Sequence, residues 1–266
     1  MASFHVMAGA DDHLVRPAIR KISLSDVFDA LRLGWRDFAR KPSHYVFLCL
    51  MYPVAGFFLA AWSAGADMLP VIYPLVTGFA LLGPFAALGL YEISRRNEQG
   101  LDDSWRHALD FLDSPALPSI LAVGILLLGL FTGWLIVAQL IYTGYFGDMS
   151  TPSLSVFLSE IFTTPQGWQV ILWGNLIGLL FAVVVLATTV VTFPLLIDRD
   201  VGAGPAVDAS IRATIANPVP VGLWGLIVAV MLFAGAVPIF AGLAVVMPVL
   251  GHATWHLYRK LVVFEA

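Results

Sequence analysis

Long apolar stretches separated by short polar segments set the pattern of this chain. Six stretches are long enough to cross a bilayer core, which takes about 20 helical residues, and none carries Asp, Glu, Lys or Arg in its interior. They are 44–64, 70–92, 117–143, 168–196, 219–236 and 238–258. The pattern predicts an all-α membrane protein with six transmembrane helices. The last two stretches are short and adjacent, so whether both cross fully stays open.

Helix-like segments with one apolar face precede each pair of stretches, at 23–42, 102–118 and 206–218. Their apolar residues recur at helical spacing. They are Leu24, Phe28, Leu31, Trp35 and Phe38 in the first segment, Trp105, Leu109 and Leu112 in the second, and Val207, Ile211 and Ile215 in the third. Two placements are open: the helices lie in the cytoplasmic interface with this face in the acyl boundary, or they fold back onto the ends of the spans.

An internal repeat organises these elements. The stretch 84–96, PFAALGLYEISRR, aligns with 248–260, PVLGHATWHLYRK, so that Pro84 meets Pro248 and Arg95 meets Arg259. After a cytoplasmic tail at 1–22, we expect a single polytopic domain at 23–266. It comprises three parallel pseudo-repeats, about 23–96, 102–200 and 206–260. Each is an interfacial helix followed by a transmembrane hairpin. Parallel repeats occur in transporters, but duplication of any membrane hairpin would produce them too.

The distribution of basic residues predicts the orientation. With six spans, all 14 Lys and Arg residues fall on one side of the membrane. The opposite side holds 65–69, the 144–167 loop and a turn at 235–238, without a basic residue. The positive side is cytoplasmic, so both termini are expected in the cytoplasm. Within the outer loop, 153–162 is expected to form a short helix.

Composition agrees with a membrane protein. Charged residues make up 12% of the chain and hydrophobic residues 59%, against about 25% charged in soluble domains. The net charge of −4 does not favour nucleic acid as a partner. The single cysteine, Cys49, excludes an internal disulfide and is expected to be a small buried hydrophobe.

Several motifs in order resemble a known family. The stretches are GWRDFARKPSHYV, GFALLGPFAALGLYEISRRNEQG, FPLLIDRDVGAGPAVDASIRATIANPVPVGLW and VMPVLGHATWHLYRK. Together they resemble the bacterial integral membrane family called domain of unknown function 2189, over about residues 20–262. The resemblance implies an inner-membrane protein and brings no reaction, since none is established for the family. Some members carry a cytochrome oxidase subunit I label.

That oxidase label fails as a catalytic claim. A haem–copper core needs about six histidines deep in helices, and of the six present here only His252 and His256 lie near a span. Their spacing of four residues places them on one helix face, where they are weak candidates for a metal site. With no obvious third ligand, an interfacial hydrogen-bonded pair is the favoured interpretation. We expect no cofactor.

Two polar groups remain as candidate sites. Three span ends can bring together a cytoplasmic cluster that binds lipid phosphate or docks a partner, although local ion pairs closing the loops are the alternative. Its members are Glu92, Arg95, Arg96, Asp198, Arg199, Asp200, Asn217, Arg259 and Lys260. Within the membrane, Gln139 and Asn175 could hydrogen-bond between antiparallel neighbours.

The sequence favours a non-catalytic protein. Its polar groups do not converge on any reaction type, and no intramembrane carboxylate suggests an ion-coupled pump. The first hypothesis is an accessory or assembly subunit that associates with another membrane complex, a respiratory complex being one candidate, or with copies of itself. The alternative is a carrier or scaffold for lipids or small apolar solutes. The phospholipid bilayer is a partner in either case.

Topology gives the first test. In a Cys49→Ser background, single cysteines at Gly9 and Ala266 should react only with reagents that reach the cytoplasm, and one at Gly147 only with an impermeant reagent added outside intact cells. Labelling of residue 9 or 266 from outside would contradict the six-span arrangement.

Overall fold

The computed structural model describes residues 17–41, 54, 73–75, 77–78, 80–147, 154–238 and 240–264. This part of the chain is helical apart from two short strands, as the apolar pattern predicts. The elements are β1 (Ala18–Ile19), α2 (Leu24–Arg40), η1 (Ala80–Leu82), α6 (Gly83–Ala86), α7 (Leu88–Glu98), η2 (Trp105–Asp113), α8 (Leu117–Phe146), α9 (Leu154–Thr163), α10 (Pro165–Thr189), α11 (Thr192–Asp198), α12 (Ala203–Ala216), α13 (Pro218–Ala236), α14 (Leu243–Leu261) and β2 (Val262–Val263).

Four helical stretches of the described chain are long and apolar enough to cross a membrane. They are Tyr73–Glu98, Leu117–Phe146, Pro165–Asp198 and Pro218–Ala236, and they match the second to fifth expected spans. The first expected span, 44–64, lies outside the described residues except for residue 54. The sixth corresponds to α14, which is not among the four. Six crossings therefore stay a prediction.

Helix α14 differs from a lipid-facing span because most of its residues are buried inside the protein. Its buried side chains include His252, Trp255 and Tyr258, and its last turn carries Arg259 and Lys260. These polar and basic residues lower its hydropathy, while burial gives them protein partners instead of lipid. The surroundings of α14 are therefore mainly other parts of the protein.

The chain divides into two compact units. The first unit contains the described parts of residues 1–53, 83–125 and 186–266. The second contains those of 54–82 and 126–185. Helices α8 and α10 each begin in one unit and end in the other.

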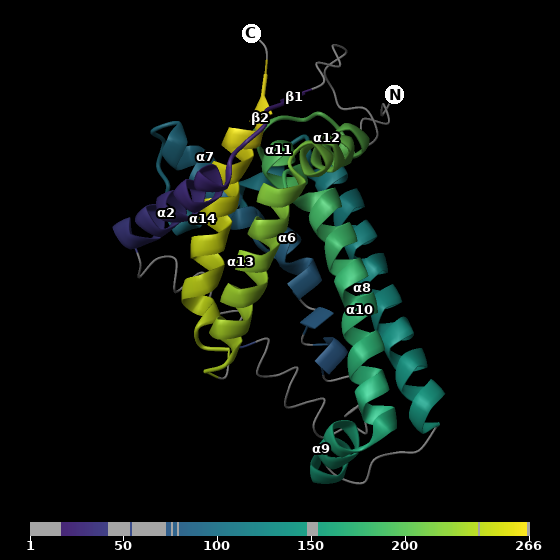
Figure 1. Cartoon of the computed structure of the whole chain (residues 1–266). Helices are drawn as coiled ribbons and strands as arrows, with labels where there is room; N and C mark the ends of the chain where they lie inside the picture. Colours follow the sequence, from purple (N-terminus) through teal and green to yellow (C-terminus); the bar gives the residue numbers. More distant parts are fainter. Residues whose placement is uncertain are drawn as a thin grey trace. The chain divides into compact units, whose positions relative to one another are not determined.

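The centre of the first unit is formed by α7, α11 and α14, which contact one another pairwise. Each of the three also contacts one of the short segments that the sequence marks as amphipathic: α7 contacts η2, α11 contacts α12 and α14 contacts α2. The first two contacts join neighbours in sequence, whereas the third joins the two ends of the chain. Figure 1 shows α2 lying beside α14.

Helix α2 begins with a capping box, in which Ser23 and Asp26 satisfy each other's backbone N–H groups. It packs on α14 through a stripe that includes Val27, Ala30 and Gly34. A Cβ atom on Gly34 would lie 2.5 Å from the Ala253 backbone nitrogen, so only glycine permits this approach.

Helix α2 therefore folds back onto a bundle helix, but not through the whole apolar stripe expected from the sequence. Of that stripe, Phe38 is buried, whereas Leu24, Phe28 and Trp35 remain exposed. The expected stripe of η2 is exposed as well, and so are Ile211 and Ile215 of α12. The physical reason is that small residues allow closer backbone approach, so they make the helix contacts.

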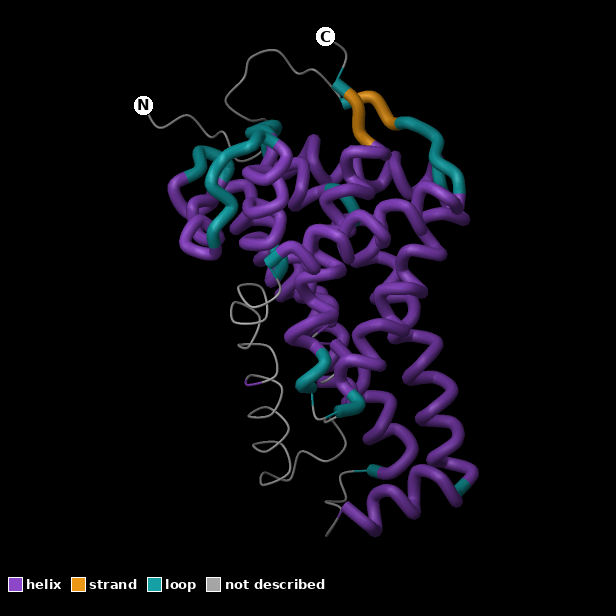
Figure 2. Tube along the Cα trace, turned by 90° about the vertical axis from the view of Figure 1, so that its left-hand side faces the viewer, coloured by secondary structure: helices purple, strands orange, loops and turns teal. Residues whose placement is uncertain are grey.

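The two strands close the first unit by joining the beginning of the chain to its end. Ala18 pairs with Val263 and Ile19 with Val262 in antiparallel register, as the orange ribbons of Figure 2 show. The Asn217 side chain holds the same segment: its Oδ1 accepts from Ile22 N–H at 2.8 Å, and its Nδ2 donates to Arg20 O at 3.1 Å.

The second unit contains the remaining halves of α8 and α10 together with α9. The Trp134 and Phe181 rings lie 5.9 Å apart, and Trp134 Nε1 donates to Pro74 O at 2.9 Å. Helix α9 forms within 144–167, where the sequence predicts a short helix. It joins α10 closely, since a Cβ on Gly167 would lie 2.2 Å from Ile161 O.

The contact at Gly34 leads to a stability prediction. Gly34→Ala should lower the free energy of unfolding in detergent by about 1–3 kcal/mol, because the added methyl group overpacks the α2–α14 contact. The control is Gly222→Ala in α13, where nothing lies within 4 Å of the new Cβ. It should be neutral or stabilising by up to about 1 kcal/mol. Equal effects of the two substitutions in denaturant titrations would contradict the packing.

Candidate functional site at the ends of three helices

The ends of α7, α11 and α14 are bonded together by one arginine and two carboxylates. Arg259 Nε donates to Glu98 Oε1 at 3.0 Å, and its Nη1 donates to Asp198 Oδ2 at 3.4 Å. Two aromatic side chains of α14 complete the group. Trp255 Nε1 donates to Glu98 Oε2 at 2.8 Å, and the Tyr258 hydroxyl donates to Asp198 at 2.7 Å. We call these five residues the exit junction.

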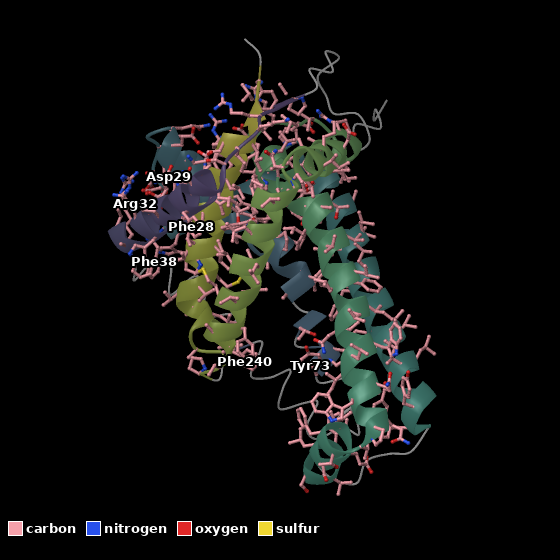
Figure 3. The ribbon with its side chains drawn as sticks, in the orientation of Figure 1. Phe28, Asp29, Arg32, Phe38, Tyr73 and Phe240 are labelled. Atoms are coloured by element: carbon pink, nitrogen blue, oxygen red, sulfur yellow. The ribbon has the colours of Figure 1, made fainter. Side chains whose placement is uncertain are left out.

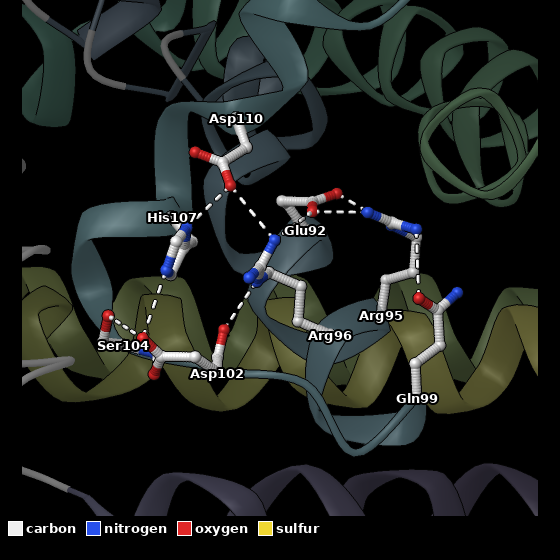
Figure 4. Close-up of polar contacts among 8 residues, drawn as sticks. All are labelled: Glu92, Arg95, Arg96, Gln99, Asp102, Ser104, His107 and Asp110. Carbon is white, nitrogen blue, oxygen red and sulfur yellow. Dashed lines mark hydrogen bonds and ion pairs between the residues drawn. The ribbon is translucent and has the colours of Figure 1, made fainter.

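A second network surrounds Glu92, one turn and a half before the exit junction on α7 (Figure 4). Glu92 is only 3% exposed. Arg95 donates to both its oxygens, Nε at 2.9 Å and Nη2 at 2.6 Å. Such a bidentate pair compensates for taking the carboxylate out of water.

Arg96 extends this network to η2. Its Nη1 donates to Asp110 at 3.1 Å and its Nε to the Asp102 carbonyl oxygen at 2.6 Å. His107 shares both aspartates, with 2.7 Å from Nδ1 to Asp110 and 3.2 Å from Nε2 to Asp102. Of the expected cluster members, Arg96 thus bonds α7 to η2, whereas Glu92 and Arg95 pair within α7.

Lys260 joins α14 to the start of α2. Its Nζ lies 2.7 Å from Asp29 Oδ2 and 3.3 Å from Asp26 Oδ1. The hydrogen bond to Asp29 is the main reason that the pKa of Lys260 lies above its ordinary value. Lys260 is therefore occupied by carboxylates of its own chain.

Asp37 binds the other end of the α2–α14 contact. It is 4% exposed, and its carboxylate lies 2.6 Å from His256 Nε2. Burial raises the pKa of Asp37, but the hydrogen bond from His256 and the neighbouring basic charges outweigh burial and hold the pKa below its ordinary value. This aspartate is therefore kept as the anion beside the histidine.

The two candidate metal ligands point to separate partners. His256 is bound to Asp37, and His252 Nδ1 lies 2.7 Å from the Ser94 hydroxyl on α7. Within the described ranges no group of three or more His, Cys, Asp or Glu residues could hold a metal ion. His252, which is buried, thus joins α14 to α7, and His256 joins α14 to α2.

The rest of the expected cluster lies on the loop between α11 and α12 and at the C-terminal end of α12. The Arg199 guanidinium carbon lies 3.7 Å from the centre of the Phe264 ring, a cation–π contact. Asp200 is half-buried, and its carboxylate has no hydrogen-bond partner in the described part of the chain. Asn217 is buried and holds the segment before α2.

The structure does not pair the two amides of the second unit. Asn175 Oδ1 accepts from the Tyr73 hydroxyl at 2.8 Å, and its Nδ2 donates to Ile171 O at 2.7 Å. Gln139 lies exposed on α8. The expected bond between them is replaced by bonds to Tyr73 and to the helix backbone, because an amide can satisfy itself within one turn.

Sequence reasoning missed several partners in these networks. Glu98 lies two residues after the stretch 84–96. Its closeness to Arg95 and Arg96 could have indicated that it belongs to the charged cluster. Asp37 lies in an amphipathic pattern where a carboxylate normally faces water, and only the packing of α2 against α14 reveals its burial. Ser94 likewise has no sequence signature.

These features define a multi-pass integral membrane protein, with several apolar helices that converge on a polar junction. A family model described as predicted integral membrane protein (DUF2189) matches residues 72–198. The family resemblance noted in the sequence is therefore confirmed over this stretch. No curated protein and no solved structure matches the chain.

The contribution of the buried Glu92 carboxylate to stability can be compared with that of Asp208, an exposed carboxylate that also binds an arginine. Glu92→Ala should cost about 3 kcal/mol of stability, because it leaves the half-buried Arg95 without its carboxylate. Asp208→Ala removes an exposed carboxylate that the half-buried Arg212 binds at 2.8 Å in α12, and should cost at most about 1 kcal/mol because water already solvates the aspartate. The measurement is detergent-solubilised unfolding monitored by circular dichroism. Indistinguishable losses would show that Glu92 is not energetically buried.

Proposed function

We propose that this chain is a non-catalytic accessory or assembly subunit that associates, through its transmembrane helices, with another membrane complex of the bacterial inner membrane. An exposed amide on a membrane helix, Gln139 of α8, carries this proposal. The exit junction then acts as the internal clamp of the subunit, not as its binding site.

Three parallel pseudo-repeats and six spans fit this proposal. Glu98, Asp198 and Arg259 are bonded together at the ends of three helices, and β1 pairs with β2 directly after the last of them. These contacts support an arrangement in which each pseudo-repeat crosses the membrane twice and both ends of the described chain lie on one side. The abundance of arginines at this side supports a cytoplasmic location.

A catalytic role has little support from the polar residues. The charged side chains of the exit junction and of the Glu92 network bind one another at 2.6–3.4 Å, which leaves them poorly placed to bind a substrate. A carrier is also less well supported, since Asn175 is bonded to Tyr73 and to its own helix instead of to Gln139. The ion pairs instead hold helices together, as a structural subunit needs.

The association face is an exposed stripe of α8, comprising Gly129, Thr132, Ile136, Gln139 and Leu140. These positions recur every three or four residues and so share one side of the helix. A Cβ on Gly129 would meet nothing within 4 Å, so the backbone is open to another helix at this point. An amide in an apolar span gains from an interhelical hydrogen bond. The stripe thus combines close approach with a polar contact, which favours a helix over lipid.

Substitutions on this face test the proposal. The protein is extracted with its surrounding lipid in polymer nanodiscs, where we expect a larger assembly. Gly129→Leu and Gln139→Leu should each reduce it to a particle with a single copy of the chain. Leucine at Gly129 blocks close approach, and leucine at Gln139 removes the amide. Mass photometry and native gels measure the size, and cross-linking from Ile136 identifies the contact.

Gly222→Leu is the matched control, because this glycine is also exposed on a membrane helix with nothing within 4 Å of a new Cβ. It should leave the assembly intact. A wild-type protein that is already a single chain in nanodiscs would refute the proposed association. An assembly built of this chain alone would refute the accessory role and leave a homo-oligomer.

A further inference from the structure

Two amphipathic segments of the first unit leave large apolar side chains uncovered. On α2 these are Leu24, Phe28 and Trp35, of which the last two are each 55% exposed. On η2 they are Trp105, Leu109 and Leu112, with Leu109 61% exposed. Single exposed apolar residues are ordinary on protein surfaces. Six on two segments, including two tryptophans, are more than scattered single residues and point to an apolar environment.

The two stripes are held in one place by contacts on the other faces of their segments. Phe38 of α2 and Ala108 of η2 pack in the same core cluster, together with Ile93 and Val249. Lys41, at the end of α2, forms an ion pair with Asp103, just before η2. The two segments that carry the stripes are therefore fixed relative to each other within the first unit.

The position of η2 along the chain sets its depth in a membrane. It ends at Asp113, and the apolar helix α8 begins at Leu117. A segment that ends three residues before a membrane helix lies at the level where that helix enters the bilayer. Tryptophan is enriched at this level because its ring is apolar and its N–H group is polar. The stripe of η2 thus lies close in sequence to the point where α8 begins.

The charges of α2 indicate which lipids the surface fits. Its aspartates are already bound: Asp26 and Asp29 to Lys260, and Asp37 to His256. By contrast, Arg32 and Arg36 are exposed and form no ion pair within the described part of the chain. Figure 3 shows Arg32 pointing away from α14, on the same helix as Phe28. Arginines flanking an apolar stripe can reach lipid phosphates while the stripe lies among acyl chains.

We infer that α2 and η2 together form a membrane-surface anchor, which inserts its apolar stripe into the leaflet next to the exit junction and selects anionic phospholipid through Arg32 and Arg36. This surface is separate from the α8 stripe of the proposed function. The anchor would hold the exit junction at a fixed depth in the membrane, whether or not a protein partner is bound.

Fluorescent labelling of the purified protein in vesicles tests the anchor. Single cysteines at Phe28 and Leu109, in a Cys49→Ser background, are labelled with an environment-sensitive nitrobenzoxadiazole dye. The protein is placed in vesicles of phosphatidylcholine with phosphatidylglycerol. Quenching by bromines on the lipid chains should be several-fold stronger at these positions than at Arg40→Cys and Asp113→Cys, which lie on the polar faces. Iodide in the water should give the reverse order.

Charge removal tests the lipid selection. The double variant R32Q/R36Q should reduce the enrichment of phosphatidylglycerol around the label at Phe28 by up to about fivefold for each arginine. The charge-matched control R20Q/K21Q, in the segment before α2, should leave it unchanged. These side chains are exposed, so none of the changes disturbs the core.

Each other outcome overturns the inference. Labels at Phe28 and Leu109 that respond to iodide as strongly as the controls place the stripe in water. Labels shielded from both quenchers place it against protein, either a second copy or a partner. If R32Q/R36Q enriches phosphatidylglycerol as much as the protein without these substitutions, then Arg32 and Arg36 do not select anionic lipid. Because purified protein alone is used, these results are independent of whether the α8 face binds another complex.

Discussion

The rest of the first unit depends on the bonds that Arg259 makes to Glu98 and Asp198, because they fix three helix ends at one level. In a membrane, charged side chains can be satisfied only at such ends or inside protein. Linking the ends of α7, α11 and α14 meets that requirement and also determines where each returning segment stops. The pairing of β1 with β2 then joins the segment before α2 to the segment after α14.

Packing around this junction follows the logic of a protein whose surroundings are partly lipid. In water, large apolar side chains would be expected to fill the helix contacts. Here Ala30 and Gly34 of α2 and Ala108 of η2 make the contacts, whereas Phe28, Trp35 and Leu109 stay outside. Small residues bring backbones close together, and in the proposed membrane anchor the large side chains would contact lipid instead of water. The same rule accounts for the exposed stripe of α8.

Neutralisation within the chain changes the meaning of the basic residues at the helix ends. Read as a linear pattern, Arg95, Arg96, Arg259 and Lys260 resemble a receptor for phosphate. In three dimensions each is bound to a carboxylate of another turn or another helix. Arg95 therefore pairs within α7, whereas Arg96 joins α7 to η2, Arg259 joins α14 to α7 and α11, and Lys260 joins α14 to α2. The cations of the proposed membrane anchor are Arg32 and Arg36 of α2. Position along the chain does not distinguish these two roles.

The sequence by itself determined the membrane class, the all-helical architecture and the location of most apolar helices, because hydropathy and length are local properties that a bilayer reads directly. It also placed charged residues at the helix ends. Only the tertiary structure decided that Asp37 is buried against His256, that Asn175 bonds to Tyr73, and that α2 packs through Gly34 and leaves Phe28 exposed. These outcomes depend on which helices become neighbours across as many as 219 positions of sequence, and such pairings arise from shape and charge complementarity that no single stretch of residues contains.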